Sequence, residues 1–444
     1  MHMRDAYEDF VCSHNEPHFI LVDHRMVGRY CTYMMRLLFL AVQLCSSFFA
    51  VAIVDDGQYE QQQLINIIQL GDSFSSGNGL GHEHTGWYGP KRCYRNIDVW
   101  GQQAVELAST ELDDTVHIEY RNHACSLSKI QHITTDYIYE EECGHEDVEN
   151  DQQLTSSGPK WGWYMNQCDY TLAPQIENVD ENTDIVLIAI GANDANFKEV
   201  ITSCFVPVLV LVEDEDCEDR TEYAMRYLEG TLSSKECEQM KSEWSAASCN
   251  YETDLINVLE TIAHRMKDGS KIIYIAYPHI AMNIDQKENQ LLREVMTMTL
   301  DVQRKVVDYL SAVLHHVDVI LFTDNVDVFA GHEANFPDAS DWGSFATDMT
   351  NPDGWYNEVS PSIIASTATN GVSHLYHPNI AGHEHLAMVL APTLESVIRE
   401  LIASRESEDE YAIIDEENSA LFELMSMSML VNDSELSHKT NGAD

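Results

Sequence analysis

The chain has 444 residues, of which 44% are hydrophobic and 22% charged, a composition that excludes a small disulfide knot and wholesale disorder. Its 25 basic and 74 acidic residues give a formal net charge of -49. A surface of this sign repels nucleic acid, anionic polysaccharide and anionic lipid headgroups, so a neutral or cationic partner is expected.

The first element is an apolar segment, Leu37–Val54, which lies downstream of several arginines. This order is typical of a secretory signal peptide, and Ala50-Val51-Ala52 has the small-x-small pattern of a cleavage site after Ala52. We therefore expect a secreted protein without a stable membrane span in its mature form. The alternative is a signal anchor with the rest of the chain lumenal or extracellular, since the segment is barely long enough to span a bilayer.

This segment also sets the predicted domain organisation. We assign residues 1–52 to an upstream extension plus signal peptide, with the h-region at 37–52 and the true start at Met34 or Met35. The main domain is predicted to span residues 60–404. Residues 405–444 are acidic and lack clean periodicity, so we expect a mostly disordered tail there.

Short apolar runs that alternate with helical patterns indicate the fold class. The predicted strands are 64–70, 116–120 (the weakest), 184–190, 271–277 and 317–322. The predicted helices are 99–109, 254–267, 288–316 and 380–404. Such alternation implies right-handed crossovers, so we predict one three-layer α/β domain with a central parallel sheet and helices on both faces.

Two acidic insertions, 138–170 and 204–250, interrupt the alternation. They hold six of the eight cysteines that follow the proposed cleavage site, and they are predicted to be disulfide-stapled surface excursions. The eight candidates are Cys93, Cys125, Cys143, Cys168, Cys204, Cys217, Cys237 and Cys249. An even set fits up to four disulfides in an oxidising compartment, but eight cysteines allow 105 pairings. Scattered reduced thiols are the alternative.

The first strand is followed by Gly71-Asp72-Ser73-Phe74-Ser75-Ser76-Gly77. Ligands of an open parallel sheet bind outside the carboxyl ends of its strands, so Ser73 is a candidate nucleophile. The motif is not the G-x-S-x-G elbow, because position 75 is serine. A purely structural alternative is that Asp-Ser caps a helix and the glycines form a loop.

The strand at 184–190 leads into Gly191-Ala192-Asn193-Asp194. From that position the Asn193 carboxamide can donate a hydrogen bond to an oxyanion that develops near Ser73. The structural alternative is an ordinary Asx turn.

His377 lies in the segment Ser373-His374-Leu375-Tyr376-His377-Pro378 before the last predicted helix. Pro378 keeps His377 out of the helical region and leaves its ring free to face a neighbour. A histidine is the general base that a serine nucleophile needs, although a structural role suits most of the 20 histidines.

Together, GDSFSSG, GAND and HPNIAGH resemble the SGNH, or GDSL, hydrolase superfamily, and in particular its secreted esterase and lipase branch familiar from actinomycetes. The resemblance implies a flavodoxin-like three-layer α/β/α sandwich. It further implies Ser73 as nucleophile, His377 as base, and Asn193 with the Ser73 amide as oxyanion donors. A disulfide between Cys93 and Cys125 is also implied.

Two positions depart from the family pattern. Most members have aspartate three residues before the catalytic histidine, where this chain has His374. The resembling branch tends to orient its base through a main-chain carbonyl at this position, so the resemblance implies that the His374 carbonyl accepts the Nδ1 proton of His377, giving a dyad instead of a triad. The family glycine after ACS is Leu127, whose amide still donates to the oxyanion, at a cost in strain if a positive φ is needed.

The sequence thus predicts a secreted serine esterase or lipase that hydrolyses carboxylic esters of small or lipid substrates through an acyl-enzyme. No cofactor or metal is expected, because the His-Glu-His triplets at 82–84 and 383–385 lack the H-E-x-x-H spacing. Two alternatives share the fold, namely an acyltransferase and a catalytically inactive extracellular binding module, and a purely structural secreted protein is the third. The natural substrate and the oligomeric state stay open.

Overall fold

The computed structural model describes residues 63–80, 86–143, 154–159, 166–205, 217–280, 286–334, 353–357 and 376–407. The predicted signal segment and most of the predicted 405–444 tail lie outside these residues. Within the described ranges, no helix combines the length and the apolar character that a membrane span requires.

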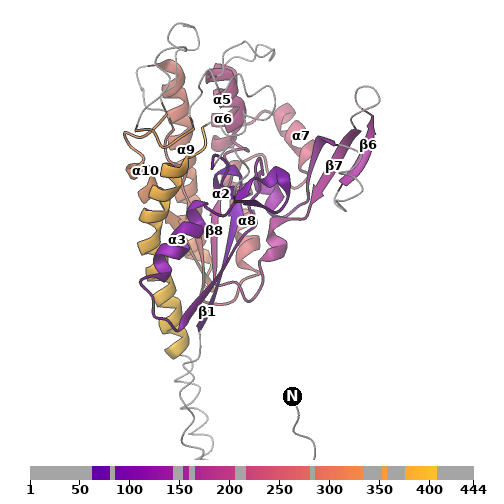
Figure 1. Cartoon of the computed structure of the whole chain (residues 1–444). Coiled ribbons are helices and arrows are strands. Elements are labelled where there is room, and N and C mark those ends of the chain that lie inside the picture. The colour runs from indigo at the N-terminus through magenta and orange to yellow at the C-terminus, as the bar shows by residue number, and fades with distance from the viewer. Residues whose placement is uncertain are drawn as a thin grey trace, which may run out of the picture. The chain divides into compact units, whose positions relative to one another are not determined.

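A five-stranded parallel sheet forms the centre of the fold (Figure 1). Its strands are β1 (Gln63–Gly71), β4 (Val116–Asn122), β8 (Ile185–Ala189), β9 (Ser270–Ile275) and β10 (Val317–Phe322). They lie in the order β10-β9-β8-β1-β4, and every neighbouring pair is parallel. Numbered along the chain this order is 2-1-3-4-5, which is the flavodoxin-like arrangement. The predicted fold class and all five predicted strands are therefore confirmed.

Burial explains why these segments form strands. Every residue of β8 (IVLIA) and of β9 (SKIIYI) is buried, as expected for central strands covered on both faces. The edge strand β4 (VHIEYRN) instead alternates between half-buried and exposed side chains until its last residue, so only one of its faces packs against the core.

The crossover helices cover both faces of the sheet. They are α3 (Trp100–Ser109), α8 (Tyr251–Ala263), α9 (Lys287–Val313) and a last helix over 380–407. The connection from β1 to β4 runs in one direction along the sheet, whereas those from β8 to β9 and β10 run in the other. Because such crossovers are right-handed, α3 lies on one face and α8 and α9, which contact each other, lie on the opposite face. The last helix joins α3, because the Trp100 N–H donates to His383 Nδ1 at 3.2 Å.

Short elements complete the described chain. They are α2 (Ser73–Ser76), β2 (Trp87–Tyr88), η1 (Lys91–Cys93), β3 (Arg95–Asn96), η2 (Ile130–Ile133), η4 (Gln175–Asn178) and α10 (Asp324–Val328). Of these, α2, η2 and η4 lie beside the main sheet, in contact with β1.

The first insertion carries regular structure that the sequence did not predict. Strands β5 (Tyr137–Cys143), β6 (Leu154–Pro159) and β7 (Asn166–Leu172) form an antiparallel sheet in the order β5-β7-β6 (Figure 1). Tyr139 and Tyr170 stack at 4.9 Å between ring centroids. Cys143 and Cys168 belong to neighbouring strands, and their side chains lie outside the described structure.

The second insertion is helical and held by covalent and ionic links. It contains α6 (Cys217–Glu229) and α7 (Ser234–Glu243), and α5 (Phe197–Phe205) leads into it. Disulfides join Cys204 to Cys217 and Cys237 to Cys249, as expected for a stapled insertion.

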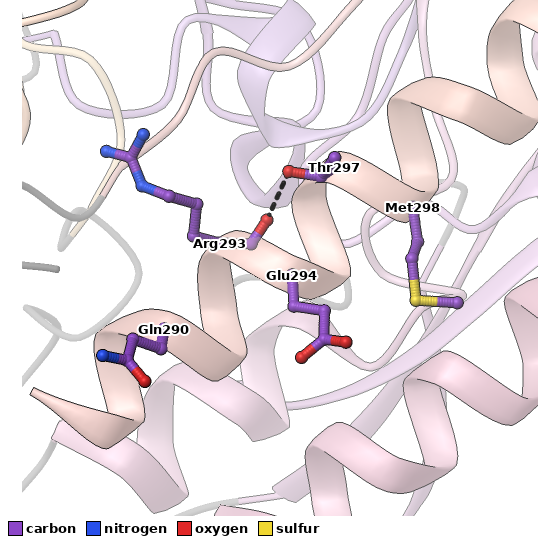
Figure 2. Close-up of a pocket in the computed structure, with 5 residues that line it drawn as sticks. All are labelled: Gln290, Arg293, Glu294, Thr297 and Met298. Atoms are coloured by element: carbon purple, nitrogen blue, oxygen red, sulfur yellow. Dashed lines mark hydrogen bonds between the residues drawn. The ribbon is translucent and has the colours of Figure 1, made fainter.

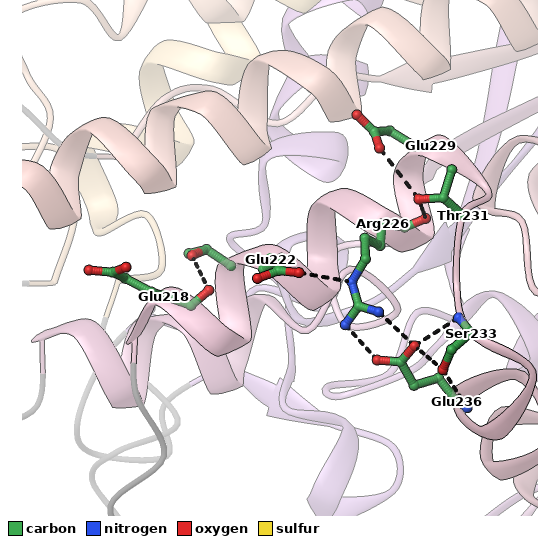
Figure 3. A network of polar contacts seen from close by, with 8 residues as sticks. Glu218, Glu222, Arg226, Glu229, Thr231, Ser233 and Glu236 are labelled. Carbon is green, nitrogen blue, oxygen red and sulfur yellow. Dashed lines mark hydrogen bonds and ion pairs between the residues drawn. The ribbon is translucent and has the colours of Figure 1, made fainter.

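An ion pair also links α6 to α7. The Arg226 guanidinium contacts both oxygens of Glu236, at 2.8 and 2.6 Å, and Glu236 forms a capping box with Ser233 (Figure 3). These hydrogen bonds lower the pKa of Glu236 to about 2. The network stabilises the helix pair, and none of its members is a predicted site residue.

Candidate active site

Ser73 begins a short helix directly after the central strand β1. Gly71 ends that strand with φ +133°, a conformation that L side chains rarely adopt, and a Cβ there would collide with the Ala189 carbonyl. Asp72 then caps α2 by accepting the Phe74 N–H at 3.0 Å, and its own N–H donates to Ala189 of β8 at 3.1 Å. This turn presents Ser73, 8% exposed, at the carboxyl end of the sheet.

The structure brings Ser73 and His377 together. His377 Nε2 lies 2.7 Å from Ser73 Oγ, although 304 residues separate them in the sequence. This edge of the sheet is also its topological switch point, because β1 and β8 are neighbours whose chain connections run in opposite directions. The pair therefore has the separation and the location of a nucleophile and its general base.

A short antiparallel bridge holds the loop that carries His377. Tyr356 pairs with Pro378, the Asn357 N–H donates to the His377 carbonyl at 2.9 Å, and the Tyr376 N–H donates to the Asn357 carbonyl at 2.9 Å. The Asn357 side chain also donates to the Gly79 carbonyl at 2.9 Å. Asn357 thus joins the His377 loop to the loop after Ser73, a role that its sequence position did not indicate.

Gly79 packs directly against the His377 loop. It has φ +105°, and a Cβ built there would lie 3.0 Å from His377 Cβ and 2.7 Å from Asn357 Nδ2, and would collide with the Pro378 carbonyl. The absence of a side chain at this position is therefore a condition for the Ser73–His377 contact.

We expect Gly79→Ala to lower kcat for the reaction of this site by about 10- to 100-fold, since small displacements of catalytic groups have effects of this size. Gly269→Ala is the matched control, because Gly269 has φ +81° and a Cβ at that position would meet nothing within 4 Å. Steady-state kinetics and thermal unfolding of both variants separate the two effects. Equal losses of activity in the two variants would show that backbone strain, and not displacement of His377, is responsible.

The turn that contains Leu127 lies beside the Ser73 loop. A disulfide joins Cys93 to Cys125, and the Cys125 N–H donates to the Gly71 carbonyl at 3.1 Å. Leu127 follows with φ +64°, the left-handed conformation in which leucine is strained, and its side chain is 37% exposed. Among the described residues, neither the Leu127 N–H nor the Ser73 N–H donates to a backbone carbonyl.

The loop after β8 is fixed to the same turn at two points. Asn193 Nδ2 donates to the Ser128 carbonyl at 2.9 Å, and Asp194 Oδ2 accepts the Ile130 N–H at 2.9 Å. A carboxamide has two N–H donors, so the bond to Ser128 orients the Asn193 side chain and leaves a second donor. Asn193 and Leu127 therefore belong to one connected unit.

Two buried carboxyl groups lie beneath the site. Burial raises the pKa of Asp72 to about 7, against the lowering effect of a 2.6 Å hydrogen bond from the Tyr277 hydroxyl. Burial likewise raises the pKa of Asp194 to about 7, against the hydrogen bond from the Ile130 N–H. The protonated, neutral form of each group is thus favoured in the folded protein below pH 7.

Stability should therefore depend on pH through Asp194. The pKa of Asp194 is about 7 in the folded protein, against an ordinary value of 3.8. The folded state therefore binds more protons than the unfolded state between these values, and the free energy of unfolding falls as the pH rises from about 4 to 7. Asp194→Asn lacks the titration, so we expect its Tm to gain several degrees relative to the wild type between pH 5 and pH 8. Thermal unfolding at both values measures the difference, with the exposed Asp113→Asn as control. A difference that does not change with pH would contradict the assignment.

The remaining predicted positions have other outcomes. His374 and residues 82–84 lie outside the described structure. His383 is fully buried, and burial lowers its pKa to about 3, so it is a neutral histidine that joins the last helix to α3. Among the described residues, no group of three or more His, Cys, Asp or Glu side chains is arranged to hold a metal ion.

A shallow pocket lies on α9, apart from the predicted site residues (Figure 2). Its lining residues are Gln290, Arg293, Glu294, Thr297 and Met298. Thr297 donates to the Arg293 carbonyl within the helix, and Arg293 pairs with Glu333 at 3.3 Å. Since neither Ser73 nor His377 lines this pocket, it does not define the site.

No protein-family model and no curated protein matches the chain. Among solved structures, an extracellular lipase from Streptomyces rimosus is similar at 19% identity and a TM-score of 0.42, covering 75% of this chain and 99% of that one. An acetylxylan esterase from Geobacillus stearothermophilus is similar at 13% identity and a TM-score of 0.32, covering 76% and 96%. An alpha/beta hydrolase enzyme from a Lake Arreo metagenome has 12% identity and a TM-score of 0.32, covering 75% and 94%. All three TM-scores are below 0.5, so these similarities carry no conclusion about function.

Proposed function

We propose that this chain is a secreted serine esterase or lipase of the SGNH type, which hydrolyses carboxylic esters through an acyl-enzyme. The observation that supports the proposal is the 2.7 Å separation of Ser73 Oγ and His377 Nε2 at the carboxyl edge of the parallel sheet. A serine hydroxyl is a weak nucleophile on its own, and an imidazole at hydrogen-bond distance is the group that activates it.

In the acylation step, Ser73 Oγ attacks the ester carbonyl carbon while His377 Nε2 takes the hydroxyl proton. The tetrahedral intermediate then collapses, the bond to the alkoxy oxygen breaks, and His377 returns the proton to the leaving alcohol. The products of this step are the free alcohol and an ester between the acyl group and Ser73.

The oxyanion of the intermediate needs hydrogen-bond donors at the same edge of the sheet. We assign this role to the Ser73 and Leu127 amides and to the second Nδ2 proton of Asn193. The left-handed turn at Leu127 and the bond from Asn193 to the Ser128 carbonyl support this assignment. Each such donor typically contributes a factor of about 100 to 1,000 in rate.

In deacylation, His377 takes a proton from water as the water oxygen attacks the acyl carbon, and it then protonates the departing Ser73 oxygen. The free carboxylic acid is released and the enzyme is restored. We propose that the His374 carbonyl accepts the Nδ1 proton and so orients the ring throughout.

Neutral esters are the proposed substrates, small or lipid-like. The formal charge of -49 disfavours strongly anionic lipid surfaces at low salt. Secretion is supported by the apolar segment before Ala52 and by the three described disulfides, which form and persist in oxidising compartments.

Hydrolysis of p-nitrophenyl esters with acyl chains of two to sixteen carbons tests the proposal on purified protein. We expect turnover with saturation kinetics and covalent labelling of Ser73 by a fluorophosphonate, located by peptide mass spectrometry. Release of acylated sugar in preference to free acid, when a sugar alcohol is added, would favour the acyltransferase. A folded protein with neither turnover nor labelling would overturn both enzymatic functions and favour the binding module.

A further inference from the structure

A buried glutamine outside every predicted motif contacts the loop of the nucleophile. Gln175, the first residue of η4, is 5% exposed. Its Oε1 accepts the Gly71 N–H at 2.8 Å and its Nε2 donates to the Gly71 carbonyl at 2.9 Å. The carboxamide therefore bonds both backbone groups of the residue that lies two positions before Ser73.

These two bonds give Gly71 backbone partners beyond the end of the neighbouring strand β4. The pairing of β1 with β4 ends at Gln69 and Asn122, so Gly71 lies beyond the end of β4 and is paired by the sheet only on its β8 side. The Gln175 carboxamide presents one of its two N–H donors and its oxygen acceptor to Gly71, in the spacing of a backbone peptide group. The Gly71 carbonyl also accepts the Cys125 N–H at 3.1 Å, whereas the Gly71 N–H is bonded to Gln175 Oε1.

The second Nε2 proton of Gln175 reaches the turn of Leu127. It donates to Ser128 Oγ at 3.1 Å, and Ser128 is fully buried. The Ser128 carbonyl in turn accepts the Asn193 carboxamide at 2.9 Å. The Gln175 side chain is thus bonded both to Gly71, in the segment that leads to Ser73, and to Ser128, the residue after Leu127. Ser128 links it in turn to Asn193.

We propose that Gln175 is a positioning residue that sets the mutual placement of the three oxyanion donors, a role that rests on the proposed function. The Ser73 amide follows Gly71 by two residues, the Leu127 amide precedes Ser128 by one, and the Asn193 carboxamide is bonded to Ser128. Donors stabilise an oxyanion only when they are held in place before it forms, so loss of Gln175 affects the transition state more than the bound substrate.

Gln175→Leu tests the role, with Gln175→Glu as a variant that keeps the volume and the acceptor for the Gly71 N–H. The matched control is Gln303→Leu, because Gln303 is also buried, at 1% exposure, but bonds the Tyr274 hydroxyl. For each protein we would measure kcat, KM, Tm, and the inhibition constant of a trifluoromethyl ketone, whose addition to Ser73 generates an oxyanion.

We expect both Gln175 variants to lower kcat by about 10- to 100-fold and to keep KM within about threefold of the wild type. This loss of kcat is smaller than that caused by removing an oxyanion donor outright. Affinity for the ketone should fall by the same factor as kcat/KM. Gln303→Leu should lose a comparable amount of Tm but keep its kcat and its ketone affinity.

Equal kinetics in the Gln175 variants and Gln303→Leu, or ketone affinity that does not follow kcat/KM, would overturn the positioning role while leaving the esterase proposal intact. A wild-type protein without ester turnover and without labelling at Ser73 would instead overturn the proposed function, and the role of Gln175 with it.

Discussion

Ser73→Ala is expected to lower kcat/KM for ester hydrolysis by about 10⁴- to 10⁶-fold, the range seen when a serine nucleophile is removed. Ser73 Oγ is the atom 2.7 Å from His377 Nε2, and alanine leaves no group that can carry the acyl chain. The residual rate should come from oxyanion stabilisation and substrate binding alone. Fluorophosphonate labelling should disappear in the same variant, while Tm changes little.

Ser76→Ala is the matched control for this prediction. Ser76 lies in the same helix, is buried, and donates from Oγ to the Ser73 carbonyl at 3.2 Å. It should keep turnover within about tenfold of the wild type, because the deletion of one neutral hydrogen bond has a modest net effect. If Ser73→Ala and Ser76→Ala hydrolyse esters at similar rates, Ser73 is not the nucleophile.

His377→Ala should lower kcat by about 10⁴-fold, because the variant lacks the imidazole that takes the Ser73 proton. The double variant Ser73→Ala/His377→Ala should be no slower than Ser73→Ala, since the two residues act as one unit. The exposed His264→Ala, whose ring stacks on His316, controls for the loss of a histidine. Additive losses in the double variant would contradict a direct proton transfer between the two side chains.

The sheet could be predicted because its central strands are buried on both faces and are therefore nearly continuous in apolar residues. That same property placed Ser73 and Asn193 at one edge, since each directly follows a central strand and parallel strands end together. His377 was identified from Pro378, which restricts its backbone, and from the residue type that a serine nucleophile requires.

Other features depend on contacts that no local pattern reveals. Strand β5 reads YIYEEEC, whose acidic half favours no strand, and its pairing with β7 comes from tertiary context. Gln175 and Asn357 lie in irregular segments, where a polar residue is ordinary. Their importance arises only because distant parts of the chain meet them. The sequence predicts backbone strain at Leu127 only if that residue has a positive φ, and its φ in the structure is +64°.

The separation of 304 residues between Ser73 and His377 has a consequence for biosynthesis. Chains emerge from the ribosome N-terminus first, and contacts this remote in sequence form late because a long loop must close. Ser73 is therefore translated, and strand β1 before it can pair, well before His377 is added to the chain. Under the proposed mechanism, a nascent or truncated polypeptide that ends before residue 377 lacks its general base, so a cell that makes this protein meets an active enzyme only after the C-terminal segment is translated.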